Sequence, residues 1–242
     1  MDILHTIVED KKVEVASLKA KRRSFRQALL DGSGIIAEFK RKSPSKGWIH
    51  EGASPVEVAV AYEKAGASCM SVLTDSKYFG GCLQDLRDVR AAVNLPLLRK
   101  DFIIDPYQIM QAREAGADAV LLIAACLEKN QCAELAAAAH EMGLETLLET
   151  HSLPELEYVG ANIDMVGVNN RNLGTFVTDI ANSYRLASAL PKDYVLVSES
   201  GISKSETIRE LKAAGFSGFL IGETFMKEDN PGDALASFIS RI

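Results

Sequence analysis

Short apolar runs recur along the whole chain, and the distance between them constrains the fold more than any other feature. Successive runs start roughly 20 to 34 residues apart, which leaves room for one helix and two loops between parallel strands. Eight such strand-and-helix units in 242 residues predict a closed (β/α)8 barrel. The runs occupy residues 35–39, 69–73, 95–98, 119–123, 146–148, 165–168, 195–197 and 219–221.

The stretches between the runs carry helix signals at both ends. Ser54 precedes Pro55 and Asp105 precedes Pro106, which is the order of an N-cap and a first helical residue. Glycine, the residue that most readily adopts the left-handed conformation of a C-cap, ends several stretches. Ser152 and Ser203 predict further helix starts, and the glycines are Gly66, Gly116, Gly143 and Gly215.

An open, doubly wound sheet is the main alternative fold. Such a sheet usually has fewer strands and a glycine-rich turn after its first strand. Residues 40–45 contain no glycine, so the barrel is favoured.

Residues 1–34 do not follow the repeat. Ile3, Ile7 and Leu18 among charged neighbours predict an amphipathic helix, and residues 24–30 predict a second short helix that docks on the barrel. We expect one (β/α)8 TIM-barrel domain over residues 1–242, with residues 1–34 as an N-terminal helical extension. Simple packing and a cover over one barrel mouth are both open roles for this extension.

The composition is that of an acidic chain with enough apolar residues for a full core. The chain is 47% hydrophobic and 25% charged, with a net charge of -6 and a pI near 5.4. A nucleic-acid-binding domain is usually basic, so we expect no nucleic-acid partner. No apolar run approaches the roughly 20 residues of a membrane helix, and we expect a cytoplasmic protein without a membrane partner, monomeric or at most weakly dimeric. The basic clusters at residues 40–42 with Lys46, and at residues 99–100, are typical of a solvated surface when taken alone.

The cysteines and histidines form no metal-binding pattern. No CxxC or HExxH spacing occurs, so we expect reduced, mostly structural thiols, no metal and no cofactor. The residues concerned are Cys69, Cys82, Cys126, Cys132, His5, His50, His140 and His151.

Glu38 and Lys40 place an acid and a base two residues apart on the first predicted strand. Side chains alternate between the faces of a strand, so both should point to the same side. Burial of two ionisable groups costs free energy unless they are paired or used for chemistry. This strand is therefore a candidate site.

Polar side chains also follow several later strands. The active site of a (β/α)8 barrel lies at the carboxyl ends of its strands, so these residues should gather at one mouth. Any one of them is explained as an ordinary loop residue, whereas the coincidence of all of them indicates a site. They are Lys100, Glu149, Asn169, Arg171 and Glu199.

Glycine-containing turns follow the last two strands, at Ser200-Gly201 and Gly222-Glu223. Barrels commonly bind phosphate at this position through backbone N–H groups, although both glycines would also serve as plain turns. An acidic side chain is unexpected beside an anion, so we expect only the amide of Glu223 to be used and its side chain to point away.

Six segments together resemble the indole-3-glycerol-phosphate synthase family. They lie at residues 37–45, 100–102, 147–149, 167–173, 198–202 and 220–222, in the order of the family and over nearly the whole chain. The first is highly specific, whereas the glycine turns are shared with many phosphate-binding barrels. The N-terminal segment is shorter than is usual in the family, which bears on how the substrate is covered.

The resemblance implies a phosphorylated small-molecule substrate, 1-(2-carboxyphenylamino)-1-deoxyribulose 5-phosphate, that is closed to indole-3-glycerol phosphate with loss of carbon dioxide and water. It implies that Lys100 is the general acid, with a pKa lowered by burial or neighbouring cations, and that Glu149 takes part in the dehydration. Glu38 would orient the lysines, while Lys40 would act in acid–base transfer or bind the carboxylate or phosphate. Substrate contacts would come from Ser43, Asn169, Arg171, Glu199, Phe79 and Phe102, and phosphate contacts from Ser200, Gly201, Gly222, Glu223 and Lys40.

Three other functions stay open at this point. Phosphoribosylanthranilate isomerase also uses a phosphate-binding barrel but would not need Glu38 and Lys40 together with Lys100. An aldolase would form a Schiff base on Lys40 or Lys100. A degenerate barrel that binds a sugar phosphate without turnover would not require Glu38 and Glu149 beside an anion.

Overall fold

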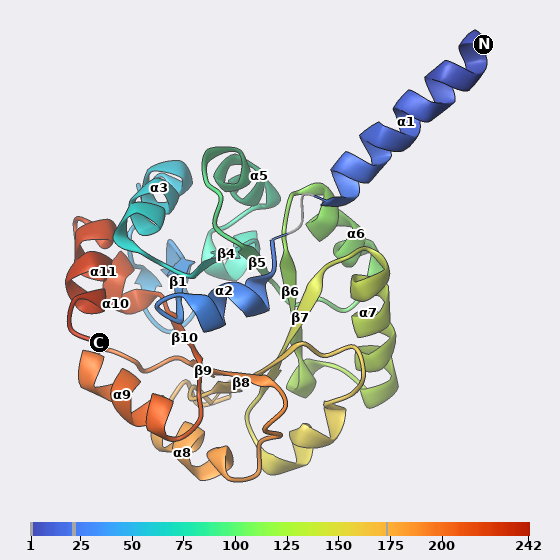
Figure 1. Ribbon diagram of the computed structural model, residues 1–242. Coiled ribbons are helices and arrows are strands. Elements are labelled where there is room, and N and C mark those ends of the chain that lie inside the picture. The colour runs from blue at the N-terminus through green and yellow to red at the C-terminus, as the bar shows by residue number, and fades with distance from the viewer. Residues whose placement is uncertain (1, 21–22, 173) are drawn as a thin grey trace.

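The computed structural model describes residues 2–20, 23–172 and 174–242. Eight parallel strands close into a barrel in the order β1-β10-β9-β8-β7-β6-β5-β4, with helices around it (Figure 1). This confirms the predicted (β/α)8 fold. The strands are β1 (Ile35–Phe39), β4 (Cys69–Leu73), β5 (Leu97–Lys100), β6 (Ala119–Ile123), β7 (Glu145–Thr150), β8 (Met165–Asn169), β9 (Val195–Glu199) and β10 (Gly218–Ile221).

Helices precede the barrel and connect its strands. In the described parts of the chain, no helix combines the length and the apolar character needed to cross a membrane. The helices are α1 (Ile3–Ala20), α2 (Phe25–Asp31), α3 (Pro55–Ala65), α4 (Ser76–Phe79), α5 (Leu83–Ala92), α6 (Pro106–Glu114), α7 (Lys129–Glu141), α8 (Ala181–Ala187), α9 (Ser205–Ala213), α10 (Glu223–Met226) and α11 (Pro231–Ile239). Two short 3-10 helices, η1 (Ala124–Cys126) and η2 (Leu153–Tyr158), and a small hairpin of β2 (Lys42–Ser43) and β3 (Gly47–Trp48) complete the connections.

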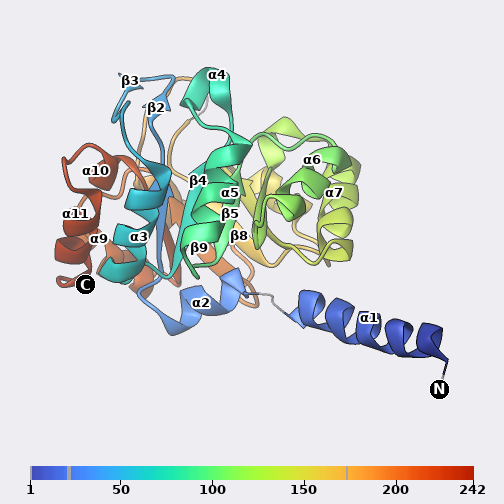
Figure 2. The same ribbon diagram turned by 90° about the horizontal axis from the view of Figure 1, so that it is seen from above.

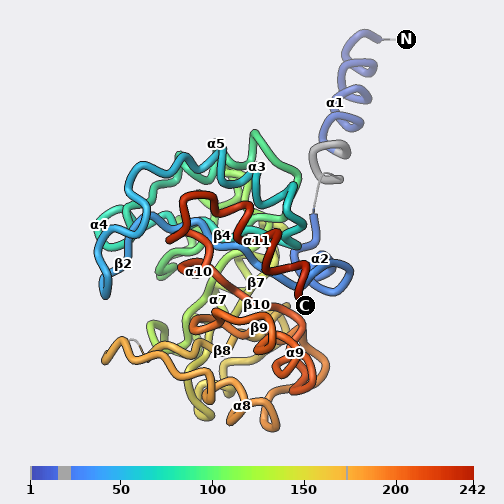
Figure 3. Tube along the Cα trace, turned by 90° about the vertical axis from the view of Figure 1, so that its left-hand side faces the viewer, coloured from blue at the N-terminus to red at the C-terminus, as the bar shows by residue number. Residues whose placement is uncertain are grey.

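The first strand closes the barrel because it pairs with a neighbour on each side. Ile36 aligns with Cys69 of β4 and with Leu220 of β10. The helical ring closes at the same place, where α11 packs beside α3 (Figure 3). Gly232 makes this contact close, since a Cβ there would lie 2.5 Å from the Cβ of Ala61.

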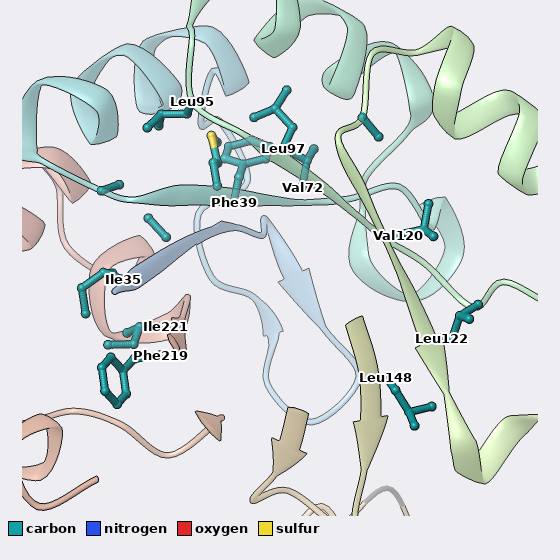
Figure 4. Close-up of a cluster of buried hydrophobic side chains, with 14 of the residues drawn as sticks. Ile35, Phe39, Val72, Leu95, Leu97, Val120, Leu122, Leu148, Phe219 and Ile221 are labelled. Atoms are coloured by element: carbon teal, nitrogen blue, oxygen red, sulfur yellow. The ribbon is translucent and has the colours of Figure 1, made fainter. Parts of the chain in front are cut away.

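Alternate residues of each strand face opposite sides and build two separate apolar layers. Ile35, Phe39 and Val72 belong to the outer layer between the strands and the helices, part of which is drawn in Figure 4. Ile36 and Leu98 belong to the inner layer, in the barrel interior. The inner layer fills the amino-terminal half of the barrel and leaves the carboxyl end for polar groups.

Helix α2 plugs the amino-terminal end of the barrel. Its Phe25 and Leu29 are buried in the inner layer, and Ser24 and the amide of Arg26 donate to the carboxylate of Glu145 at the start of β7, at 2.6 and 2.7 Å. Figure 2 shows α2 on the side of the barrel opposite the β2–β3 hairpin and α4. The predicted docking of residues 24–30 is therefore confirmed.

Helix α1 extends away from the barrel in Figures 1 and 2. Ile3 and Ile7, two residues of the predicted amphipathic face, have exposed fractions of 71% and 50%. Leu18 lies in a part of α1 whose side chains are outside the described residues. The predicted helix forms, but its described apolar residues do not pack on the barrel.

The predicted helix ends are confirmed at four glycines, and a helix also starts after Ser152, whereas the predicted start at Ser203 is shifted. Gly66, Gly116, Gly143 and Gly215 have φ values of 91°, 88°, 72° and 102°. Ser152 precedes a 3-10 helix instead of an α-helix, because the connection between β7 and β8 is the shortest between successive barrel strands. Helix α9 starts at Ser205 with Lys204 as its N-cap, one residue later than an N-cap at Ser203 predicts.

We predict that Phe25→Ala lowers the free energy of unfolding by about 3 to 5 kcal/mol, because truncation leaves a cavity under the barrel. Urea unfolding monitored by circular dichroism measures this loss. Leu30→Ala is the matched control, since Leu30 lies on the same helix with an exposed fraction of 46%. Its effect should stay within about 0.5 kcal/mol. Equal effects of the two substitutions would contradict the role of α2 as a plug.

Candidate active site

A pocket of about 890 Å³ opens at the carboxyl ends of the strands. Its lining includes Lys46 from the turn of the β2–β3 hairpin and Phe79 from α4. These two elements lie at the end of the barrel opposite α2 (Figure 2). The predicted residues that line it are Glu38, Lys40, Phe79, Lys100, Phe102, Glu149, Asn169, Arg171, Glu199, Ser200, Gly201, Gly222 and Glu223. The structure thus brings all of the predicted residues except Ser43 to one pocket.

Glu38 and Lys40 point into the barrel as the alternation of β1 predicts. Lys40 Nζ lies 2.7 Å from Glu38 Oε1, so the acid and the base form an ion pair. Burial alone would raise the pKa of Glu38, but Lys40, together with Lys100 and Arg171, outweighs burial and holds this pKa below its usual value. Glu38 is therefore a carboxylate at neutral pH.

Lys100 lies among three carboxylates at the centre of the pocket. Its Nζ is 3.4 Å from Glu149 Oε2 and 3.7 Å from Glu199 Oε2. Burial favours the neutral amine, but Glu149, Glu199 and Glu38 together outweigh it and raise the pKa of Lys100 above its usual value. The expectation of a lowered pKa is wrong, because the groups nearest to Lys100 are acids and not cations.

Glu199 is a buried carboxyl group whose surroundings strongly raise its pKa. Its side chain is 1% exposed, and among the described residues neither carboxyl oxygen has a hydrogen-bond partner. Burial and the charges of Glu149 and Glu38, opposed by Lys100, raise the pKa of Glu199 to about 8. Space for this group comes from Gly167, where a Cβ would lie 2.4 Å from Glu199 Oε1.

Glu149 has a second neighbour that the sequence analysis missed. His151 Nε2 lies 3.4 Å from Glu149 Oε1, and His151 Nδ1 lies 3.5 Å from Glu155 Oε2. The imidazole therefore stands between a pocket carboxylate and a second acid. The alternation of side chains along a strand could have identified His151, because residue 151 lies two positions after Glu149 and shares its face.

The turns after β9 and β10 form the other wall of the pocket. Ser200 and Gly201 have φ values of 69° and 78°, so two successive residues adopt the left-handed conformation. Asn170 holds this turn, because its Nδ2 donates to the carbonyl oxygen of Ser200 and to Ser198 Oγ, both at 3.1 Å. At Gly222 a Cβ would lie 2.5 Å from Glu38 Oε1, so this glycine makes room for Glu38.

The sequence predicts that the side chain of Glu223 points away from the pocket. This prediction is wrong, because the side chain lines the pocket. Its Oε1 lies 2.5 Å from Lys46 Nζ, and its Oε2 lies 3.8 Å from Arg171 Nη2. Lys46, which the sequence analysis did not assign to the site, and Arg171 also line the pocket. The two cations attract the carboxylate inward.

Aromatic rings and a serine stand at the outer part of the pocket. The rings of Phe79 and Phe102 lie with their centroids 6.3 Å apart. Ser43 is buried and does not line the pocket, and among the described residues its hydroxyl has no hydrogen-bond partner. Ser45 is the serine of this segment that lines the pocket.

Most residues of the basic clusters are not solvated, although the Lys46 side chain is 58% exposed. Arg99 is 3% exposed and its guanidinium lies 2.9 Å from Asp101 Oδ2, while Lys100 points to the opposite face. Arg41 lies 2.7 Å from Asp85 Oδ2 and is mostly covered. Adjacent residues of a strand face opposite sides, so one cluster supplies both a structural ion pair and a pocket cation.

The fold and the pocket define a (β/α)8 barrel in which buried carboxyl groups and lysines lie beside a wall of glycine turns and cations. A family model described as indole-3-glycerol phosphate synthase matches residues 3–238. The indole-3-glycerol phosphate synthase of Bacteroides thetaiotaomicron is 55% identical over 257 aligned positions, covering 100% of this chain and 99% of that protein. The indole-3-glycerol phosphate synthase of Polynucleobacter asymbioticus is 44% identical, with 99% of each chain covered. The chain therefore belongs to the indole-3-glycerol phosphate synthase family.

Solved structures share the fold at low sequence identity. Two from Pyrococcus furiosus, of a tryptophan synthase complex and of a mutant tryptophan synthase alpha-subunit, superpose with TM-scores of 0.64 and 0.65 at 14% identity. Each covers 87% of this chain and 97% of its own. This similarity concerns the barrel architecture alone.

We predict that Glu199→Gln stabilises the fold relative to wild type increasingly as the pH rises from 5 to 8. The pKa of Glu199 is raised to about 8 in the folded protein, so the folded state binds more protons than the unfolded state across this range. Wild-type stability then falls with rising pH, and glutamine removes this dependence. Urea unfolding at several pH values measures it, with the exposed Glu134→Gln on α7 as control. A constant difference between variant and wild type would contradict the raised pKa.

Proposed function

We propose that the chain catalyses the conversion of 1-(2-carboxyphenylamino)-1-deoxyribulose 5-phosphate to indole-3-glycerol phosphate, with release of carbon dioxide and water. Family membership supports this reaction. The observation that carries it is the position of Lys100 Nζ between Glu149 and Glu199, at 3.4 and 3.7 Å, in a pocket that also holds Lys40 and Arg171. The reaction needs both parts: proton transfer at the reacting carbons, and cations for a substrate with two anionic groups.

Substrate binding is assigned to the wall of cations and glycine turns. The phosphate would accept hydrogen bonds from the amides of Ser200, Gly201, Gly222 and Glu223, since consecutive left-handed residues leave N–H groups free to converge on an anion. Phe79 and Phe102 would contact the aromatic ring, which stacks or packs edge-on against such side chains. Asn169, Arg171 and Glu199 keep their assignment as substrate contacts, whereas Ser43 does not line the pocket and Ser45 takes its place as the serine of that segment.

Lys40 is assigned to substrate binding. It is already paired with Glu38 at 2.7 Å, and its charge also helps to hold the pKa of Glu223 below its usual value. Lys40 therefore acts on the part of the pocket where an anion is expected. Glu38 orients Lys40 and contributes to the field around Lys100, as the resemblance implied.

Lys100 is assigned to ring closure. Its raised pKa keeps it charged at neutral pH, so it can donate a hydrogen bond to the substrate carbonyl and stabilise the negative charge that develops on the oxygen. The proton moves to this oxygen as the new carbon–carbon bond forms. Lys100 therefore promotes ring closure by stabilising the charge that develops on this oxygen. The lowered pKa that was expected of the general acid is not required for this role.

Glu149 is assigned to proton transfer in the later steps, when a ring proton is lost and a hydroxyl group leaves as water. Its two oxygens face Lys100 and His151, so it lies between two groups that can exchange protons with it.

The raised pKa of Lys100 also argues against a Schiff-base aldolase, because little neutral amine is present to attack a carbonyl. Borohydride trapping of a covalent adduct would reverse this assignment. A parallel assay with the substrate of phosphoribosylanthranilate isomerase distinguishes the proposed reaction from that of the isomerase. Tight binding of the sugar phosphate without turnover would indicate a binding module.

The cytoplasmic location and the monomeric or weakly dimeric state stay predictions. Light scattering tests the oligomeric state.

We predict that Lys100→Ala lowers kcat by about 10²- to 10⁴-fold, the usual contribution of a positioned proton donor. Indole fluorescence of the product measures the rate with the carboxyphenylamino substrate. Lys64→Ala, at the exposed end of α3, is the control and should retain wild-type activity. Full activity of the Lys100 variant would rule out the assigned acid, and no product from wild-type protein would rule out the reaction.

We predict that Gly167→Ala lowers kcat by about 10²-fold while the barrel still folds, because misplacement of a catalytic group by about 1 Å has such an effect. The added Cβ would lie 2.4 Å from Glu199 Oε1, which has to move. The same fluorescence assay and a circular dichroism spectrum measure activity and fold. Gly52→Ala, where nothing lies within 4 Å of the added Cβ, is the control. Equal activity of both variants would contradict the requirement for space at Gly167.

A further inference from the structure

Glu223 places a negative charge in the wall where the proposed function requires an anion to bind. The side chain lines the pocket, with Oε1 at 2.5 Å from Lys46 Nζ and Oε2 at 3.8 Å from Arg171 Nη2. Lys46 belongs to the turn of the β2–β3 hairpin, Arg171 follows β8, and Glu223 begins α10. One carboxylate thus joins three segments around the mouth of the barrel.

The carboxylate is ionised in these surroundings. Burial alone would raise the pKa of Glu223, but Lys46, Lys40 and Arg171 outweigh it and hold the pKa below its usual value. These three cations are also the groups available to the anionic parts of the substrate. Glu223 therefore makes the same kind of contact that a bound phosphate or carboxylate would make.

A bound phosphate and this carboxylate would compete for the same surroundings. The phosphate is assigned to backbone amides that include the amide of residue 223, so it would lie close to the side chain of the same residue. Two anions repel at such a distance. The pair is able to separate, because the side chains of Lys46 and Glu223 have exposed fractions of 58% and 30% and lie at the solvent side of the pocket.

We propose that Glu223 is an internal counter-anion, which pairs with Lys46 and Arg171 in the free protein and is displaced when the phosphate group of a ligand binds. This inference rests on the proposed function of the pocket. Its consequence is that Glu223 weakens the binding of anionic ligands and favours their release. The side chain then sets both the KM for the substrate and the affinity for the product.

The test removes the charge and keeps the backbone amide. Glu223→Gln and Glu223→Ser should bind inorganic phosphate about tenfold more tightly than wild type, because a like charge no longer faces the ligand. Isothermal titration calorimetry with inorganic phosphate measures this affinity. With substrate, the variants should show a lower KM and stronger inhibition by product.

Glu134→Gln is the matched control, since it removes the same charge from an exposed position on α7 that does not line the pocket. Its phosphate affinity should change by less than about twofold. Weaker phosphate binding by both Glu223 variants would overturn the proposal, because the carboxylate would then be needed to position the cations. An affinity equal to that of the control would overturn it as well.

The outcomes separate this inference from the proposed function. Tighter phosphate binding by the variants, with no turnover by the wild type, would support the counter-anion and reject the reaction. Normal wild-type turnover with unchanged phosphate binding would support the reaction and reject the counter-anion. Two substitutions of different size at residue 223 guard against a folding defect, which a thermal melt detects.

Discussion

Charge neutralisation inside the carboxyl end of the barrel is the constraint on which the rest of the site depends. Glu38, Glu149 and Glu199 are almost fully buried, and a buried charge without a partner costs several kcal/mol. Lys100 and Lys40 neutralise part of this charge. Burial and the neighbouring acids raise the pKa of Glu199, so this group ionises less readily and the remaining charge is reduced.

The same balance explains why the most acidic part of the pocket does not exclude an anionic ligand. The acids surround Lys100, whereas Lys46 and Arg171 lie toward the turns after β8 and β10, together with Glu223. The pocket is thus divided into a part in which acids surround Lys100 and a part in which the Glu223 carboxylate lies between two cations. Inward-facing glycines supply the necessary space, as Gly167 and Gly222 do for Glu199 and Glu38.

The strands were predictable because a short apolar run between two helix signals is best explained as a buried strand. Residues 69–73 and 119–123 were predicted with the observed bounds, while β5 starts two residues later than predicted, after Pro96. The strand β9 continues beyond its apolar run to Ser198, which contacts Ser183 of α8, and to Glu199, which faces the pocket. Such an extension depends on what lies across the barrel and leaves no local pattern.

Charge pairing was less predictable than strand position. Arg99 and Lys100 are neighbours in the sequence, yet one forms a structural ion pair outside the barrel and the other faces the pocket. The alternation of a strand predicts opposite faces, but it does not predict which face carries acids. The position of His151 beside Glu149 was accessible from alternation, whereas the pairing of Lys46 with Glu223 joins residues from opposite ends of the barrel repeat.

By itself, the sequence determined the barrel, the polar residues at its strand ends and the resemblance to a family, because periodicity, helix caps and short motifs are local properties of the chain. The tertiary structure decided the direction of each pKa shift and the partner of each charge. These depend on burial and on distances between residues far apart in sequence. Lys100 is the clearest case: its position was predictable, but only the three carboxylates that the fold places around it raise its pKa.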